Sequence, residues 1–481
     1  MLANVIRPIS RRTWIRNILS AAAIFQMPRR SLGQEKSTSA MPSAFRVRSI
    51  IELNGEVHLK AQNAPSTTKD GKPTIARRAP VESKSTLDYD QQYILGETDE
   101  SIRGYLFFHE AHSEITVDRH TTQTVLRDNC KEIVKLSTGR GIHPAALSSP
   151  LFAAERELVN GAIDSMYVDQ LLTEKEVAIA DKWNVDRVSA ARLLHLDAIL
   201  DGDLTVCLIE TDDEKAHLEI SGKLQATAKD VGTQMEIKGK ALMDRKGGYI
   251  SWLAMQIDET REIGEAEPGF KVVASIRVLR APIESMSSGR SLAQVWAEAP
   301  SPESAEMLQF QSDLGFYRFL ADCRWSTYRD NGEEATLRYV VNNRRVAQCN
   351  ITNLVDSQPG DHLSLEGYQA DLERVASRAG REILEATEQL TASKHRMLRI
   401  TMTGSVDGIP LRWIHYHISN DMGRRLALVF TTDESSLDVF ANQDAQIIDS
   451  MELLEWPSKL DASSLESQSV ESAAVPGNTK K

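Results

Sequence analysis

Two histidines on one predicted strand, His415 and His417, come nearest in type and spacing to a metal site. Side chains two residues apart on a strand share a face, so both imidazoles could reach one ion. A third ligand does not follow from the sequence. The alternative, which we favour, is a pair of surface histidines beside the core residues Trp413 and Tyr416. We therefore assign no catalytic residue and expect no cofactor.

A second histidine pair, His109 and His112, flanks Glu110 in a stretch that also has the pattern of a strand. Zinc proteases use the spacing H-E-x-x-H, which places two histidines one helical turn apart, and this spacing differs. A strand would direct the two side chains to opposite faces. We predict no site at this position.

Carboxylates gather in residues 258–267, where paired acids could perform acid–base chemistry if burial separated their pKa values. The cluster has Arg261 inside it and comprises Asp258, Glu259, Glu262, Glu265 and Glu267. We favour the alternative of a solvated strand end that runs into a turn. Gly139-Arg140-Gly141 is too short for a phosphate-binding loop, and the chain has no nucleophile elbow, P-loop or dinucleotide fingerprint.

Four widely spaced cysteines, Cys130, Cys207, Cys323 and Cys349, show neither C-x-x-C nor a zinc pattern. Residues 323–354 read as a three-stranded meander, with Cys349 opposite Thr336. This register places Cys323 and Cys349 on the outer strands, farther apart than the roughly 7 Å between Cα atoms that a disulfide tolerates. We expect these two cysteines to be buried free thiols.

Length and charge limit the classes of function. The chain has 481 residues, which suggests two or three domains with tails, and a formal net charge of -12. Residues 1–33 hold six arginines and no acid, so the remainder is still more acidic. Such a chain is a poor binder of nucleic acid or anionic lipid through bulk charge. No stretch approaches the roughly 18 apolar residues of a membrane span, so we expect no integral membrane protein.

Residues 1–33 have the three-part plan of a signal peptide: a basic stretch, a short apolar run from Ile18 to Met27, and small residues. Within it, Ser10-Arg11-Arg12-Thr13-Trp14-Ile15-Arg16 resembles the twin-arginine export signal. The resemblance implies a periplasmic or extracellular protein, cleaved after Gly33 or Ala40. Residues 34–43 would be a linker. The alternatives are a disordered cytosolic N-terminus and a true start at Met41.

The first domain is predicted over residues 44–282. Apolar and polar residues alternate through residues 216–226 and 235–243, and the pattern continues to residue 279, which is typical of strands with one buried face. Residues 62–85 read as a loop, and helices are expected from Pro150 and over residues 190–200. This strand rhythm resembles the half-barrel of periplasmic lipoprotein carriers, which would imply a curved antiparallel sheet packed on helices.

A linker is predicted over residues 283–306, a second domain over residues 307–455 and a disordered tail over residues 456–481. In the second domain we expect a long helix over residues 364–390 and a closing strand over residues 447–451. The order of elements resembles the PsbP-like fold and DcrB-type envelope lipoproteins, whose members mostly bind partners. The resemblance rests on Gly315, Phe316, Trp325, Gly408, Trp413, Tyr416, the strand of residues 426–430 and that closing strand.

These observations predict an α+β protein of two domains, each a curved antiparallel sheet packed against helices. The function they favour is an exported, non-catalytic binding or scaffold protein of the bacterial cell envelope, whose partner is an unknown protein or an apolar small molecule. One alternative is a carrier that holds an apolar ligand in the first domain. The other is an exported metal-dependent hydrolase that uses His415 and His417.

Overall fold

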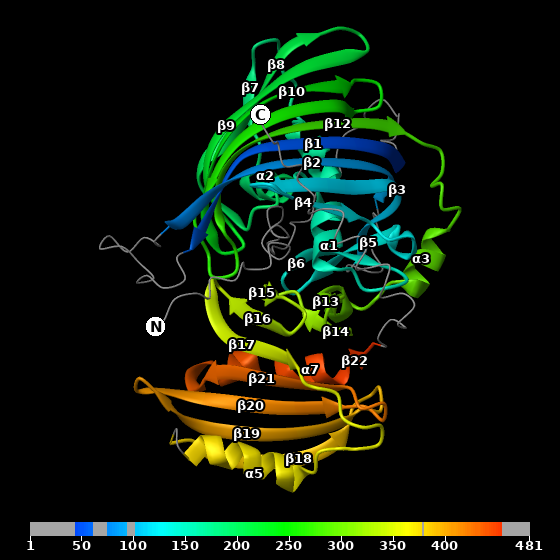
Figure 1. The fold of residues 1–481 in the computed structure, drawn as a ribbon. Coiled ribbons are helices and arrows are strands. Elements are labelled where there is room, and N and C mark those ends of the chain that lie inside the picture. Colours follow the sequence, from blue (N-terminus) through cyan, green and yellow to red (C-terminus); the bar gives the residue numbers. More distant parts are fainter. Residues whose placement is uncertain (1–43, 61–74, 94–101, 378–379, 455–481) are drawn as a thin grey trace, which may run out of the picture.

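A computed structural model describes residues 44–60, 75–93, 102–377 and 380–454 (Figure 1). The predicted signal peptide, the linker of residues 34–43 and the tail of residues 456–481 lie outside the described residues. Of the residues described, 57% are strand and 16% helix. The predicted α+β class is therefore wrong, and the protein is mostly antiparallel β. Its longest described helix has 12 residues, so strands build most of both cores.

The N-terminal part forms one strongly curved, twelve-stranded sheet in the order β6-β5-β3-β2-β1-β12-β11-β10-β9-β8-β7, with β4 paired to β3. Its strands are β1 (Ala44–Lys60), β2 (Ile75–Tyr93), β3 (Ile102–Val117), β4 (His120–Val125), β5 (Glu132–Thr138), β6 (Gly141–Ala146), β7 (Lys182–Asn184), β8 (Ala198–Thr211), β9 (Lys215–Ala228), β10 (Val231–Asp244), β11 (Tyr249–Arg261) and β12 (Gly269–Pro282).

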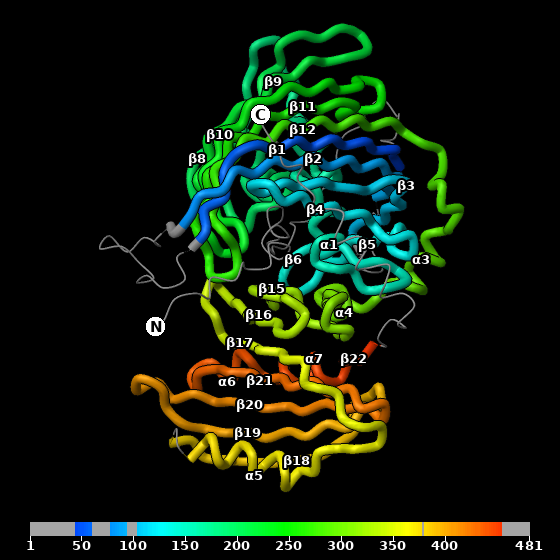
Figure 2. The backbone as a smooth tube through the Cα atoms, in the orientation of Figure 1, coloured from blue at the N-terminus to red at the C-terminus, as the bar shows by residue number. Residues whose placement is uncertain are grey.

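The first and last strands of this part, β1 and β12, pair side by side, although β1 ends at Lys60 and β12 begins only at Gly269 (Figure 2). Their pairing closes the centre of the sheet. Gly55 on β1 permits the close approach, because a Cβ atom there would lie 2.2 Å from the carbonyl oxygen of Lys271. The predicted alternation is confirmed in β9 to β12, where every second side chain is buried.

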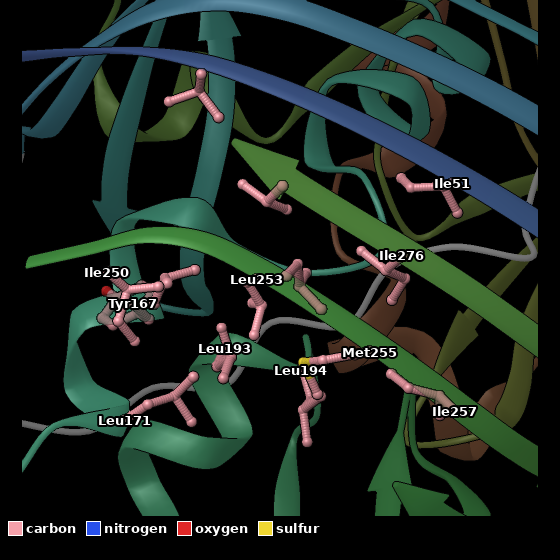
Figure 3. Packing of buried hydrophobic residues seen from close by; sticks show 14 of the residues in the cluster. Ile51, Tyr167, Leu171, Leu193, Leu194, Ile250, Leu253, Met255, Ile257 and Ile276 are labelled. Carbon is pink, nitrogen blue, oxygen red and sulfur yellow. The ribbon is translucent and has the colours of Figure 1, made fainter. Parts of the chain in front are cut away.

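Short helices occupy the concave face of the sheet: α1 (Ala153–Asn160), the 3-10 helix η2 (Ser165–Leu171) and α2 (Arg187–Leu193). Leu171, Leu193 and Leu194 pack there against Leu253 and Ile276 of the sheet (Figure 3). All five of these side chains are buried. Burial of aliphatic side chains at roughly 25 cal/mol per Å² of apolar surface is the main term that holds helices to the sheet.

The C-terminal part contains a seven-stranded antiparallel sheet, in the order β15-β16-β17-β21-β20-β19-β18, and a three-stranded sheet, in the order β13-β14-β22. The strands are β13 (Met307–Ser312), β14 (Tyr317–Asp322), β15 (Trp325–Asp330), β16 (Glu334–Val341), β17 (Arg344–Asn353), β18 (Glu382–Leu390), β19 (Arg396–Val406), β20 (Ile409–Ser419), β21 (Arg425–Asp433) and β22 (Glu452–Leu453). The remaining helices are η1 (Asp128–Cys130), α3 (Leu292–Glu298), α4 (Pro302–Ala305), α5 (Leu365–Ala376), η4 (Glu434–Ser436), α6 (Leu437–Phe440) and α7 (Gln443–Asp449).

Several predicted elements of this part are wrong. The long helix of residues 364–390 is helix α5 followed by strand β18, because Gly380 adopts φ 64° and breaks the helical path. The closing strand of residues 447–451 lies largely in helix α7. The predicted linker of residues 283–306 contains α3 and α4, whose Val295 and Ala305 pack with the buried Tyr105.

Two predictions for the N-terminal part also need correction. The expected loop of residues 62–85 is strand from Ile75 onward, where β2 pairs with both β1 and β3. The helix expected over residues 190–200 is present as α2, but it ends at Leu193. The strand β8 begins at Ala198, within the residues expected to be helical.

All four cysteines are free, and the predicted meander is present as β15, β16 and β17. The register differs by one residue from the prediction, because Cys349 pairs with Leu337. Cys349 is buried as expected, whereas Cys323 is half-buried and lies in the turn after β14. In the described part of the chain, no helix has the length and apolar character needed to cross a membrane.

Candidate functional site

A cavity of about 550 Å³ lies between the large sheet and the C-terminal part. Helix α1, the turn between β5 and β6, and the loop after α2 line one wall. The turn between β14 and β15 and the hairpin of β16 and β17 line the other. A volume of this size is typical of sites that bind small molecules or short chain segments. We therefore take this cavity as the candidate functional site.

Helix α1 presents one face to the cavity, because Ala153, Arg156, Glu157 and Asn160 recur at helical spacing. Its opposite face is anchored by the buried Glu155. The carboxylate of Glu155 accepts hydrogen bonds of 2.7 Å from the guanidinium of Arg127 and one of 2.9 Å from the backbone N–H of Phe152. This anchoring fixes which face of the helix meets the cavity.

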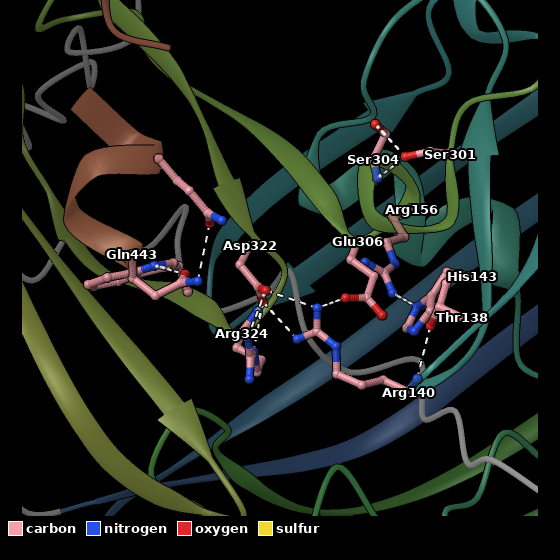
Figure 4. Close-up of polar contacts among 12 residues, drawn as sticks. Thr138, Arg140, His143, Arg156, Ser301, Ser304, Glu306, Asp322, Arg324 and Gln443 are labelled. Atoms are coloured by element: carbon pink, nitrogen blue, oxygen red, sulfur yellow. Dashed lines mark hydrogen bonds and ion pairs between the residues drawn. The ribbon is translucent and has the colours of Figure 1, made fainter. Parts of the chain in front are cut away.

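Asp322, at the end of β14, joins the two parts of the chain (Figure 4). Its carboxylate accepts hydrogen bonds of 3.1 and 2.9 Å from Arg140 of the β5–β6 turn and two of 2.9 Å from the side chain of Arg324. Arg140 also forms an ion pair with Glu306. Burial alone would raise the pKa of Asp322, but the hydrogen bonds from Arg324 and Arg140 outweigh it and lower the pKa to about 2.

A second pair on the same wall, His143 and Arg156, has unsatisfied donors (Figure 4). Arg156 Nη2 donates to His143 Nδ1. Burial, followed by the charges of Arg156 and Arg140, lowers the pKa of His143 to about 2, so this imidazole is neutral. Since Nδ1 accepts, the proton of the neutral ring lies on Nε2. Both His143 Nε2 and Arg156 Nη1 are buried and have no hydrogen-bond partner among the described residues.

A second group of residues that line the cavity is acidic. Lys229 Nζ donates to Glu157 at 3.1 Å and to Glu267 at 3.3 Å. Asp197 and Asp230 also line the cavity, and Asp197 accepts a hydrogen bond of 2.8 Å from the backbone N–H of Asp230. Burial raises the pKa of Glu267 and of Asp197. The lining of the cavity thus contains guanidinium groups and, besides Asp322, four carboxylates, two of which are paired with Lys229.

His415 and His417 lie far from this cavity in the fold, on β20 beneath helix α5. They share one face of the strand, as predicted, but His417 is buried rather than on the surface and contacts Tyr368 of α5. The described residues include no group of three or more His, Cys, Asp or Glu side chains that could hold a metal ion. These histidines therefore form a pair without a third ligand in the part of the chain that is described.

The acidic cluster of residues 258–267 is a solvated strand end only in part: Asp258 and Glu262 are exposed, as expected, whereas the end of the cluster is buried. Arg261 and Glu267 are buried. Glu259 accepts hydrogen bonds from Arg261 and from the hydroxyl of Thr233. Glu267 lines the cavity and accepts a hydrogen bond of 3.3 Å from Lys229 Nζ. The turn geometry of residues 264–269 turns this side chain inward instead of leaving it in solvent.

Sequence reasoning missed the residues that make the cavity polar: Arg140, His143, Arg156, Asp322 and Arg324. Arg140 was visible within Gly139-Arg140-Gly141, which was set aside as a phosphate loop. The available signal was a lone arginine in a tight hairpin turn, where Gly141 takes a φ of 130°. Such an arginine extends away from the sheet that carries it. His109 and His112, by contrast, lie on β3, where their ring nitrogens lie 3.1 Å from carboxylate oxygens of Asp90 and Glu110 respectively.

Comparisons with known proteins do not identify a family: no family model and no curated protein matches the chain. A crystal structure from Bacteroides thetaiotaomicron VPI-5482 is similar over 31% of this chain, at 9% identity and a TM-score of 0.23, and the chain spans 48% of that structure. The immunity protein TplEi of Pseudomonas aeruginosa is similar over 48% of this chain and 95% of its own, at 9% identity and a TM-score of 0.19. OccAB3 of Acinetobacter baumannii is similar over 80% of this chain and 98% of its own, at 9% identity and a TM-score of 0.13. Scores this low establish no common fold.

Proposed function

We propose that this chain is an exported, non-catalytic binding protein of the bacterial cell envelope, and that the cavity between its two parts is the binding site. One observation carries the proposal: His143 and Arg156 line a cavity of about 550 Å³, and their buried donors Nε2 and Nη1 have no hydrogen-bond partner among the described residues. Buried donors are normally satisfied, and leaving one unpaired costs roughly 1–3 kcal/mol. A ligand acceptor would remove that cost.

Three titratable groups of the cavity, His143, His195 and Asp322, favour binding over catalysis, although burial raises the pKa of Asp197 and Glu267. A general acid or base works best when its pKa lies near the operating pH. Burial lowers the pKa of His195 to about 4 and that of His143 to about 2. The pKa of Asp322 is held at about 2. None of these three groups exchanges protons readily near neutral pH, whereas all can position or repel charge.

The carrier alternative placed an apolar ligand on the concave face of the large sheet. Side chains of η2 and α2 occupy that face (Figure 3). A cavity between these helices and the sheet, near Leu194 and Ile257, measures about 40 Å³. That is room for about one water molecule rather than an acyl chain. We therefore place the ligand between the two parts of the chain.

Native mass spectrometry of the full chain isolated from its own cells tests this proposal. Ala153→Phe would fill the cavity from helix α1, and Ala154→Phe is a matched control because Ala154 does not line the cavity. We expect a bound mass on the wild type and on Ala154→Phe, and its loss from Ala153→Phe. A bare polypeptide mass for the wild type would contradict the proposal.

A further inference from the structure

We infer that the convex face of the large sheet carries an apolar patch, bordered by cations, that docks on the surface of an anionic lipid bilayer. The patch consists of side chains from four strands: Ile50, Leu242, Trp252 and Leu279. None of them lines the cavity between the two parts of the chain. The inference therefore goes beyond the proposed function and stands or falls separately from it.

The alternation of side chains along each strand places this patch on the face that the helices leave open. Leu253 of β11 points to the concave face and packs with the helices there, so its chain neighbour Trp252 points to the convex face. Leu279 is 56% exposed and Ile50 is 38% exposed, and Trp252 and Leu242 are half-buried. Contiguous exposed apolar side chains on a protein surface indicate an interaction site.

The strand register makes the members of the patch neighbours. Leu279 of β12 is the direct cross-strand partner of Trp252 of β11, which is in turn the partner of Leu242 of β10. Ile50 of β1 lies diagonal to Leu279, because its own partner on β12 is Arg277, two residues away. Direct partners have Cβ atoms roughly 5 Å apart, and diagonal ones roughly 7–8 Å. The patch thus runs without a gap across β1, β12, β11 and β10, which are adjacent in the sheet (Figure 1).

Exposed cations border the patch directly. Arg48 and Arg277 are the cross-strand partners of its members on β12 and β1. Lys240 precedes its member on β10 by two residues and shares the same face of that strand. The carboxylates of this region lie farther from the apolar centre than these cations do; they are Glu52, Asp88 and Glu219. A partner that covers the patch therefore meets positive charge around an apolar centre.

An anionic lipid surface matches this combination. Tryptophan and aliphatic side chains enter the boundary between headgroups and acyl chains, while arginine and lysine extend their charged ends to the lipid phosphates. The formal net charge of -12 opposes attraction of the chain as a whole to such a surface. Binding then depends on this local arrangement and on the orientation that it imposes.

Two other occupants fit less well. A second copy of the chain would place the cations of one patch against those of the other, which repel each other. A stable protein partner buries roughly 800 Å² on each side of an interface with matching shape. Four partly exposed side chains on a convex sheet offer less area than that. A lipid surface, by contrast, adapts to a convex shape.

Co-flotation of the chain, isolated from its own cells, with lipid vesicles tests the inference. We expect binding to vesicles of phosphatidylglycerol and phosphatidylcholine in equal parts, and roughly tenfold weaker binding to phosphatidylcholine alone. Leu279→Asp should weaken binding to the anionic vesicles roughly tenfold, because it removes an inserted apolar side chain and adds a like charge. All proteins are compared in the same N-terminal form, since residues 1–33 are basic.

Val273→Asp is the matched control. Val273 lies on the same strand and the same face as Leu279 and is 38% exposed, but its cross-strand partners are Asn54 and Asp258. It adds the same charge outside the patch, so binding should remain as in the wild type. Equal binding by Leu279→Asp and Val273→Asp would overturn the assignment of the patch.

Quenching of tryptophan emission by brominated lipid reports which side chain enters the bilayer. The quenched part of the emission should fall in Trp252→Phe, and an unchanged quenched part would overturn the inference. No flotation of the wild type with anionic vesicles, or equal flotation with phosphatidylcholine alone, would also overturn it. A dimer in the native mass spectrum that is lost from Leu279→Asp, without flotation of the wild type, would assign the patch to a second copy instead.

Discussion

The carboxylate of Asp322 is the most consequential single group in the contact between the two parts of the chain. It is 6% exposed and accepts hydrogen bonds from Arg140, 182 residues away in sequence, and from Arg324. We expect Asp322→Asn to lower the free energy of unfolding by about 3 kcal/mol, because it removes the buried carboxylate that Arg324 and Arg140 share and leaves Arg140 with Glu306 only. Urea-induced unfolding followed by tryptophan fluorescence would measure the change.

The matched control for that substitution is Asp128→Asn. Asp128 pairs with Lys131 on the surface, and its side chain is 94% exposed. An exposed ion pair contributes little to stability, so the control should unfold almost as the wild type does. Equal effects of the two substitutions would show that the Asp322 cluster does not hold the two parts together.

Buried donors without an acceptor should lower the free energy of unfolding of the ligand-free protein. Substitution of His143 and Arg156 tests this expectation. The double substitution His143→Phe and Arg156→Met removes both unpaired donors together with the hydrogen bond between the two side chains. Replacing both partners with apolar groups of similar shape relieves the desolvation penalty, so we expect the ligand-free protein to gain about 1 kcal/mol. Calorimetric unfolding measures this, and a loss of stability would mean that the pair serves the fold.

The sequence could not predict this cluster, because its members are brought together by tertiary contacts. Arg140 and Asp322 belong to different predicted domains, and neither lies in a recognisable motif. His143 precedes a proline in strand β6 and has no histidine partner that would draw attention to it. The two histidines that the sequence did single out, His415 and His417, stand out because they are two residues apart in the chain, which says nothing about a third group.

At the scale of elements, strands with one buried face were predictable and mixed segments were not. The alternation in residues 216–243 has one interpretation, and β9 and β10 follow it. Residues 364–390 contain apolar side chains at spacings that suit both periods, so the helix was extended through residues that form β18. The positive φ of Gly380, a backbone property, decided the boundary.

The packing of α5 on β20 makes the C-terminal sheet sensitive to acid. Burial, with smaller contributions from Arg381 and Arg425 respectively, lowers the pKa of His415 and of His417 to about 4. In the unfolded chain both histidines are protonated as the pH falls through about 6.5, whereas in the folded protein they stay neutral until the pH reaches about 4. The stability is therefore complete above pH 6.5 and should fall by up to about 1.4 kcal/mol per pH unit for each histidine as the pH drops toward 4.

Urea-induced unfolding at several pH values between 7 and 4 tests this sign. The double substitution His415→Leu and His417→Leu should make the profile less steep, because neither side chain can then bind a proton, while His143 and His195 keep their lowered pKa values. His120→Leu changes an exposed histidine of β4 and serves as the control. A profile of the double variant as steep as that of the wild type would assign the acid sensitivity to other groups.

At the scale of the whole molecule, the contacts between the two parts fix the width of the cavity from several directions. Besides the Asp322 cluster, the side chain of Asn343 accepts a hydrogen bond of 2.8 Å from the backbone N–H of Glu265. The backbone N–H of Gln309 donates to Leu151 at 2.9 Å, directly before helix α1. These polar links, together with the Asp322 cluster, hold the two walls of the cavity at a set distance.

We propose export as a further property of the whole chain, on the pattern of residues 1–33, which lie outside the described residues. A guanidinium is a planar fork of donors and an ammonium is a point charge, so a receptor that reads the resemblance to a twin-arginine signal should distinguish the two. We expect Arg11→Lys with Arg12→Lys to leave the precursor uncleaved in the cytoplasm. Lysine at Arg29 and Arg30, beyond the apolar run, is the matched control and should permit export.

Cell fractionation and N-terminal sequencing would locate the chain and its cleavage site. A new N-terminus after Gly33 or Ala40, recovered outside the cytoplasm in the wild type and control but not in the double variant, is the expected result. Equal export of the wild type, the double variant and the control would exclude the twin-arginine route for this chain. The resemblance to that signal would then no longer support a place in the cell envelope.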